Sequence, residues 1–301
     1  MRLTPTRALA LAIEPFAGQV YFSPECHRGY AALGFGPSPA KMGEVQMPDG
    51  AAYFCSRGSV MGQVPGEVIA AAFGVFNPAI VVPAVTYGWT LTDAATICGV
   101  RTDGALQQLR RVLGAHPAGL DRVVELLRRA TESLSLAGKP LFAGLVAQGL
   151  PGEPLADAWR LADQLREYRG DAHVNAWTTA GFDGAEIGLI TELYWGLPLR
   201  SYVRTRAWTD DELAAAEDRL QARGLLRDGA FTDAGRAARE AVEMSTDDAC
   251  APVVAALRDD LDELVAAVGA WSKQVQEAAG YPASGPQELA ALTSGQSGTH
   301  A

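Results

Sequence analysis

The chain has 301 residues, nearly half of them hydrophobic, and a net charge of −10. This length is enough for two domains of ordinary size with a substantial core. An acidic chain is expected to stay in solution and to avoid anionic membranes and nucleic acids, unless its basic residues gather on one surface.

The first part of the chain carries no clear signal for export or membrane insertion. An apolar run at residues 8–13 is too short for a signal peptide and ends at Glu14. No charged residue occurs in residues 68–92, a length that raises the question of a membrane span. Asn77-Pro78 divides this stretch, so we predict two short buried helices there and a cytoplasmic protein.

The cysteines, Cys26, Cys55, Cys98 and Cys250, contain no CxxC pair. Such irregular spacing is typical of reduced thiols in a cytosolic protein. We predict neither a metal site nor a cofactor. The chain also lacks GxGxxG, P-loop, GxSxG and HExxH motifs, which argues against dinucleotide binding, nucleotide binding, α/β-hydrolase chemistry and zinc proteolysis.

The N-terminal half is predicted to be helical but irregular. Ser23, Pro24 and Glu25 mark a helix start. Residues 34–50 form a Gly/Pro-rich segment, which we interpret as a loop that could order over a ligand. Amphipathic patterns predict further helices at residues 105–114 and 121–138. We assign residues 1–150 to one helical domain.

The next helices follow from apolar spacing and from helix-stop residues. Residues 153–170 are predicted to be a helix that ends at Gly170, and Asp171 is predicted to cap the following helix. Residues 183–196 form another apolar helix, and a short helix is predicted to begin at Pro198.

Local signals then predict a winged helix. Thr209 and Glu212 form a capping box, Asp228-Gly229 forms a two-residue hairpin turn, and Thr232 caps the returning helix. Residues 252–271 are predicted to be one more amphipathic helix. The expected fold is mainly α: a helical N-terminal domain, a C-terminal winged helix with a small β-hairpin in residues 151–272, and a disordered tail in residues 273–301.

Two resemblances fit this pattern. Residues 183–244 resemble the MarR-type winged-helix proteins, through the spacing of "LQARGLL" and "TDAGR". The chain from Leu9 to about Leu264 resembles an actinobacterial family of helix-turn-helix proteins, through "VYFSPECHRGYAALGF", "AYFCSRGSVMGQVPGEVIAAAFGVFNP" and "LREYRGDAHVNAW". The second resemblance implies a helical N-terminal domain joined to a winged helix, and it implies no reaction.

The helix that would enter a DNA groove has the wrong charge for that role. Residues 209–224 contain five acidic side chains and two arginines, whereas phosphate neutralisation supplies most non-specific DNA affinity. Arg200, Arg204 and Arg206 are the only basic cluster of this domain. They either contact phosphate or pair with acidic residues of the following helix, and we favour pairing, so DNA binding is not expected.

Two polar side chains stand out as candidates for a site. Arg57 lies among aromatic residues such as Tyr53 and is costly to bury without a partner. It could bind a carboxylate or phosphate of a ligand, or pair with Glu25, Glu67 or Asp93. His173 and Trp177 share one helix face and could contact a ligand, although an interfacial histidine is the simpler interpretation.

Aromatic residues provide a further candidate pocket lining, although aromatic side chains at helical spacing more often belong to the core. The residues concerned are Tyr21, Phe22, Phe73, Phe76, Tyr87, Trp89, Tyr194 and Trp195.

The sequence favours a protein of specialised metabolism that binds a small, partly apolar, anionic molecule near the junction of its two domains. The expected ligand contacts are Arg57, Tyr53, His173, Trp177 and Glu25, and we expect a homodimer by analogy with other winged helices. Two alternatives stay open. One is a biosynthetic enzyme with His173 as acid or base and Arg57 as anion contact. The other is a ligand-responsive transcriptional regulator.

Overall fold

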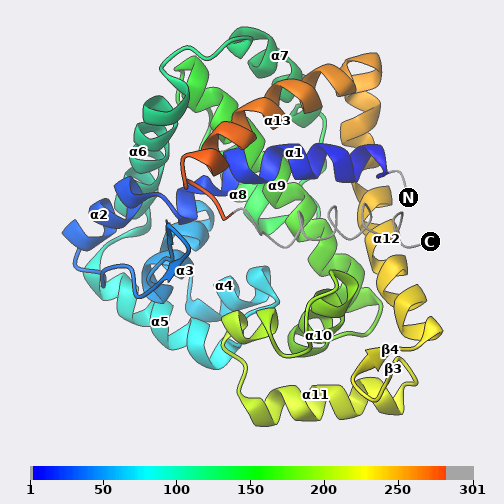
Figure 1. Ribbon diagram of the computed structural model, residues 1–301. Coiled ribbons are helices and arrows are strands. Elements are labelled where there is room, and N and C mark those ends of the chain that lie inside the picture. Colours follow the sequence, from blue (N-terminus) through cyan, green and yellow to red (C-terminus); the bar gives the residue numbers. More distant parts are fainter. Residues whose placement is uncertain (1–2, 283–301) are drawn as a thin grey trace.

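The computed structural model describes residues 3–282, and this part of the chain is mainly helical (Figure 1). The α-helices are α1 (Pro5–Gly18), α2 (Pro24–Ala32), α3 (Gly50–Gly58), α4 (Gly66–Phe73), α5 (Pro78–Leu91), α6 (Ala94–Leu113), α7 (Leu120–Thr131), α8 (Pro140–Ala147), α9 (Pro154–Thr179), α10 (Gly184–Tyr194), α11 (Asp210–Ala222), α12 (Asp233–Leu257) and α13 (Leu261–Glu277). Short 3₁₀ helices are η1 (Gln19–Tyr21), η2 (Ser59–Met61), η3 (Tyr202–Arg206) and η4 (Arg258–Asp260). Two antiparallel hairpins pair β1 (Lys41–Met42) with β2 (Val45–Gln46) and β3 (Leu226–Arg227) with β4 (Ala230–Phe231).

The described residues form two hydrophobic cores. The larger core takes side chains from residues 9–172 and again from residues 250–281, and the smaller core takes them from residues 177–242. Figure 1 shows α1 and α13 lying side by side across α9, so the first and last helices of the described residues close the larger core together. Helices α9 and α12 connect the two cores. The smaller core is therefore an insertion between two segments of the larger one.

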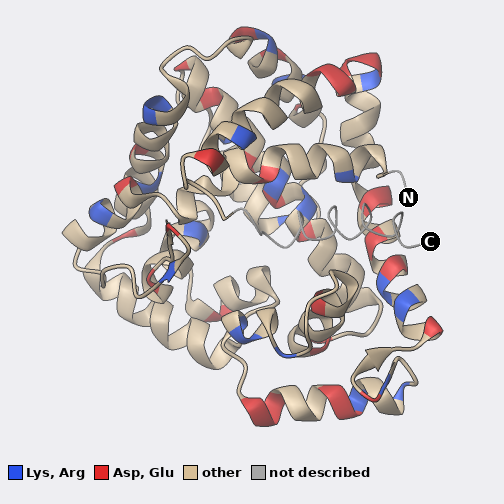
Figure 2. Ribbon diagram, in the orientation of Figure 1, with Lys and Arg blue, Asp and Glu red and all other residues tan. Residues whose placement is uncertain are grey.

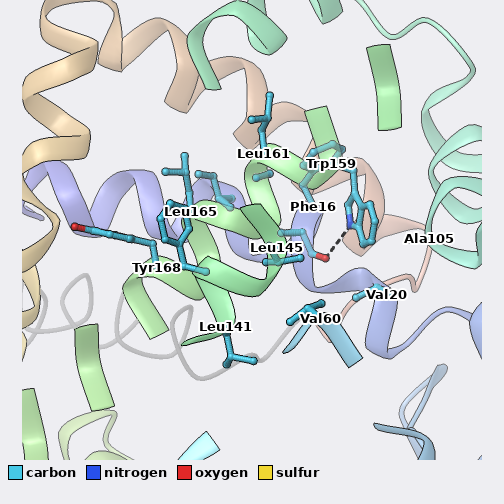
Figure 3. Close-up of a cluster of buried hydrophobic side chains, with 14 of the residues drawn as sticks. Phe16, Val20, Val60, Ala105, Leu141, Leu145, Trp159, Leu161, Leu165 and Tyr168 are labelled. Carbon is cyan, nitrogen blue, oxygen red and sulfur yellow. Dashed lines mark hydrogen bonds between the residues drawn. The ribbon is translucent and has the colours of Figure 1, made fainter. Parts of the chain in front are cut away.

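Trp159 is the largest side chain that the larger core buries completely. It lies on α9 among aliphatic and aromatic side chains of other helices, including Phe16 and Leu145 (Figure 3). Its indole Nε1 donates a hydrogen bond to the carbonyl oxygen of Ala17 at 3.1 Å. This bond satisfies the one polar atom of the ring, so burial of the whole side chain is favourable.

Helix α9 does not end at Gly170 as predicted but continues to Thr179. The buried side chains before and after Gly170 pack into the two cores, and this packing outweighs the intrinsic cost of glycine in a helix, about 1 kcal/mol. Asp171 is a capping residue of another helix: its Oδ2 accepts hydrogen bonds from the backbone N–H groups of Leu141 and Phe142 at the start of α8. Asp171 therefore caps a helix that precedes it in the chain, and not the helix that was predicted to follow it.

The uncharged stretch forms two helices, α4 and α5, as predicted from Asn77-Pro78. They are not fully buried, however, because Ile80 and Tyr87 on α5 remain about half exposed. Within residues 3–282, no helix has both the length and the apolar character that crossing a bilayer requires.

The order α10, η3, α11, β3–β4 and α12 is that of a winged helix, as predicted. Thr209 and Glu212 form the predicted capping box, and Asp228 and Gly229 both have positive φ, as a type I′ turn requires. The short helix predicted from Pro198 is instead η3. The predicted helix at residues 252–271 is also wrong: α12 continues past Pro252 to Leu257, and η4 separates it from α13.

The predicted disordered tail is helical where it begins. Helix α13 continues to Glu277, and the Tyr281 side chain is buried against the larger core. The rest of the predicted tail, residues 283–301, lies outside the described residues.

Candidate functional site

A cavity of about 1170 Å³ lies where the larger core meets the smaller one. Its walls come from α1, α3, α9, α10, η3 and α12, which surround the centre of the molecule in Figure 1. Ligand pockets in proteins usually hold about 300–1,000 Å³. This central cavity is therefore large enough for a substantial organic molecule.

The charged residues that line the central cavity are mostly arginines. Seven arginines and four glutamates line it, which leaves three positive charges in excess in a chain whose net charge is −10. The residues are Arg7, Arg57, Arg166, Arg169, Arg206, Arg236 and Arg239, with Glu14, Glu167, Glu240 and Glu243. An excess of positive charge on a concave surface attracts ligands of the opposite sign, so the cavity favours anions.

Arg57 lines the cavity but already has an acidic partner. Its Nε and Nη2 donate to the two carboxylate oxygens of Glu167 at 2.9 and 2.7 Å, and its Nη1 donates to the hydroxyl of Tyr53 at 3.3 Å. Burial favours the neutral acid, but the Arg57 and Arg166 guanidiniums outweigh it and lower the pKa of Glu167 to about 2. The partner is thus Glu167 on α9 and none of the three acids considered from sequence.

His173 also lines the cavity, in a wall formed by α9 and α12. Its Nδ1 lies 3.1 Å from the hydroxyl of Thr246. Burial lowers the pKa of His173 to about 3; the Glu243 carboxylate opposes this shift, and the Arg239 and Arg169 guanidiniums add to it. The imidazole is therefore neutral at physiological pH.

Arg206, on η3, is half-buried and lines the cavity without an acidic partner among the described residues. Its guanidinium lies 4.6 Å from the ring centroids of both Phe76 and Tyr202, and its Nη2 donates to the Tyr202 hydroxyl. The aromatic rings hold the guanidinium in place without neutralising it. This arrangement leaves a fixed positive charge at the cavity wall.

The neighbouring arginines behave as the favoured interpretation predicted. Arg200 pairs with Glu217, and Arg204 pairs with Asp210, both across to α11. Arg206 is the exception, because it turns towards the cavity. Along α11 itself, acidic residues outnumber basic ones (Figure 2), so the charge of this helix is unfavourable for phosphate.

Two further candidates lie away from the cavity lining. Trp177 is buried in the smaller core. Glu25 pairs with Arg111 of α6 at 2.8 Å. Of the aromatic residues considered from sequence, five line the cavity: Tyr21, Phe22, Phe76, Tyr194 and Trp195. Phe73, Tyr87 and Trp89 do not belong to its lining.

Most of the charged residues that line the cavity were not predicted from the sequence. Arg7 joins Glu240 and Asp247 of α12 at 2.9 and 2.7 Å, and Arg166 joins Glu14 of α1 at 2.9 Å. One signal was available on α9: Glu167, which lines the cavity, continues a buried helix face that also carries the charged Arg160 and Asp163, both outside the lining. Such a face requires partners from other helices.

Among residues 3–282, no three His, Cys, Asp or Glu side chains gather as they would around a metal ion. A family model described as a helix-turn-helix family matches residues 6–282. Neither a curated protein nor a solved structure matches the chain.

Proposed function

The chain belongs to this helix-turn-helix family over residues 6–282. We propose that it binds a small organic anion in the central cavity. The observation that carries the proposal is Arg206, a half-buried guanidinium that faces the cavity and has no carboxylate partner among the described residues. A guanidinium removed from bulk water is costly unless an anion joins it. A carboxylate or phosphate of a ligand would supply that anion.

The remaining lining indicates what else the ligand contains. Ten aromatic side chains line the cavity, among them Tyr53 and Trp195, and they offer surfaces for stacking. The ligand is therefore a planar or partly apolar organic acid and not a small inorganic ion. Arg57 has a secondary role in this proposal, because Glu167 already neutralises it.

Substitution Arg206→Gln is expected to weaken the binding of an aromatic carboxylate about tenfold. Loss of a charge-assisted hydrogen bond costs about 1.5–3 kcal/mol, which corresponds to at least a tenfold change in affinity. The probe is dansylglycine, whose fluorescence rises in an apolar site. Its dissociation constant is measured by titration with the wild-type protein and the variant.

The matched control variant is Arg204→Gln, because Arg204 lies on the same short helix, outside the cavity, and pairs with Asp210. It should leave the affinity for dansylglycine unchanged. Dansylamide, which lacks the carboxylate, should bind wild type and Arg206→Gln equally. Equal loss of affinity in both variants, or no binding of dansylglycine to the wild type, would contradict the proposal.

Family membership also favours a second candidate, a ligand-responsive regulator. The segment that carries Arg206 leads directly into α11, the helix that would enter a DNA groove in a winged-helix protein. A ligand bound to Arg206 would therefore lie close to the start of that helix. If the protein is such a regulator, a gel shift should show a DNA duplex from the upstream region of the gene bound at about 50 mM salt and released at about 200 mM. Because acidic residues dominate α11, we expect no retardation at either salt concentration.

A further inference from the structure

The hydroxyl of Thr246 determines which nitrogen of His173 carries its proton. This hydroxyl donates a hydrogen bond to the carbonyl oxygen of Val242, one turn earlier on α12, at 2.8 Å. A hydroxyl has only one hydrogen, so towards His173 it can only accept. Nδ1 of His173, 3.1 Å away, must therefore be the protonated nitrogen of the neutral ring.

The second ring nitrogen, Nε2, is then an acceptor with a free lone pair. It has no hydrogen-bond partner within residues 3–282, and His173 belongs to the cavity lining. The charged groups around the ring lie on the same two helices, α9 and α12, and are already occupied: Arg169 and Arg239 both pair with Glu243, at 2.8 and 2.7 Å. The surrounding positive charges disfavour a second proton on the ring.

From this geometry we infer that Nε2 of His173 accepts a hydrogen bond from the ligand of the central cavity. The ligand then carries an O–H or N–H donor in addition to its acid group, as a hydroxyaryl acid or an amide-bearing acid does. The inference rests on the proposed function, since it concerns the same cavity, but it uses a different wall and a different kind of contact.

The tautomer can be tested without any ligand. In long-range ¹H–¹⁵N spectra of the full chain, comparison with His173→Asn assigns the His173 signals. We expect the Nδ1–H tautomer, unchanged from pH 7 to about pH 4, because the pKa of His173 is lowered to about 3. An Nε2–H tautomer, or protonation near the ordinary histidine pKa of about 6.5, would overturn the inference.

Contact with a donor is tested with two neutral probes that share one ring system, naphthol and its methyl ether. Wild-type protein should bind naphthol about fivefold more tightly or better, since the ether cannot donate to Nε2. His173→Asn keeps a donor near the Nδ1 position and loses the acceptor, so this preference should vanish. His173→Gln places an amide oxygen near the Nε2 position and should retain part of it.

The outcomes separate this inference from the proposed function. Equal binding of the two probes by wild type, or a preference that survives in His173→Asn, would overturn the role of His173 while dansylglycine binding stands. Failure of dansylglycine to bind would overturn the proposed function itself. A preference for naphthol that His173→Asn abolishes and His173→Gln partly restores would support the inference.

Discussion

Replacing Glu167 with Gln is expected to destabilise the protein by about 3–5 kcal/mol, since breaking a buried ion pair leaves an uncompensated charge. Glu167 is 2 % exposed and accepts hydrogen bonds from both Arg57 and Arg166. The variant retains the shape of the side chain but removes the only carboxylate that pairs with Arg57 among the described residues. Urea unfolding followed by circular dichroism measures the free-energy difference.

Because Glu167 is paired with arginines, the difference in unfolding free energy between wild type and Glu167→Gln should depend on pH. The pKa of Glu167 falls from 4.5 to about 2 on folding, so its stabilising contribution is fully present above about pH 5 and is lost as the pH falls towards 2. Wild type and Glu167→Gln should therefore converge in acid. As control, Glu277→Gln removes an exposed partner of Lys273 and should cost at most about 1 kcal/mol. Comparable losses in the two variants would contradict a buried network.

Truncation of Trp159 to Ala should cost about 3–5 kcal/mol of unfolding free energy, through lost burial and the cavity left behind. The side chain has no exposed surface and lies in the middle of the larger core (Figure 3). Chemical denaturation again provides the measurement, with the slope of the transition confirming that the same surface unfolds.

Two companion variants test the reason for this loss. Trp159→Phe keeps one aromatic ring and loses the rest of the indole together with the bond to Ala17, so it should cost less than Trp159→Ala, which removes both rings. Tyr87→Ala truncates an aromatic side chain that is 54 % exposed and should change stability by about 0.5 kcal/mol or less. A Trp159→Ala loss no larger than that of Tyr87→Ala would place Trp159 outside the core.

Features set by neighbouring residues could be predicted from the sequence. The Thr209–Glu212 capping box, the Asp228-Gly229 turn and the helix start at Ser23 each depend on residues within four positions of one another, and all three are present. The winged helix followed from them, because caps, turn and apolar spacing agreed. The predictions from sequence ended one helix at Gly170 and began another at Pro252, whereas α9 and α12 continue through these residues. Packing against distant segments overrides the local helix preference there.

The candidate site was harder to predict because its contacts join segments that are far apart in sequence. Arg57 and Glu167 are separated by 110 positions, and no local pattern connects them. Arg206 differs in direction from Arg204, which lies two residues earlier on the same 3₁₀ helix: Arg206 faces the cavity and not α11. Arg57 and His173 stand out in the sequence by their unusual neighbours, whereas their partners, Glu167 and Thr246, are apparent only in the fold.

The pairing of α1 with α13 has a consequence for biosynthesis. The backbone N–H of Phe16 donates to the hydroxyl of Ser272, a residue that follows 256 positions later. At typical translation rates this separation corresponds to a delay on the order of 10–50 seconds. During that delay the apolar side chains of α1 lack their partner helix, so the nascent chain needs protection from premature association until α13 has left the ribosome.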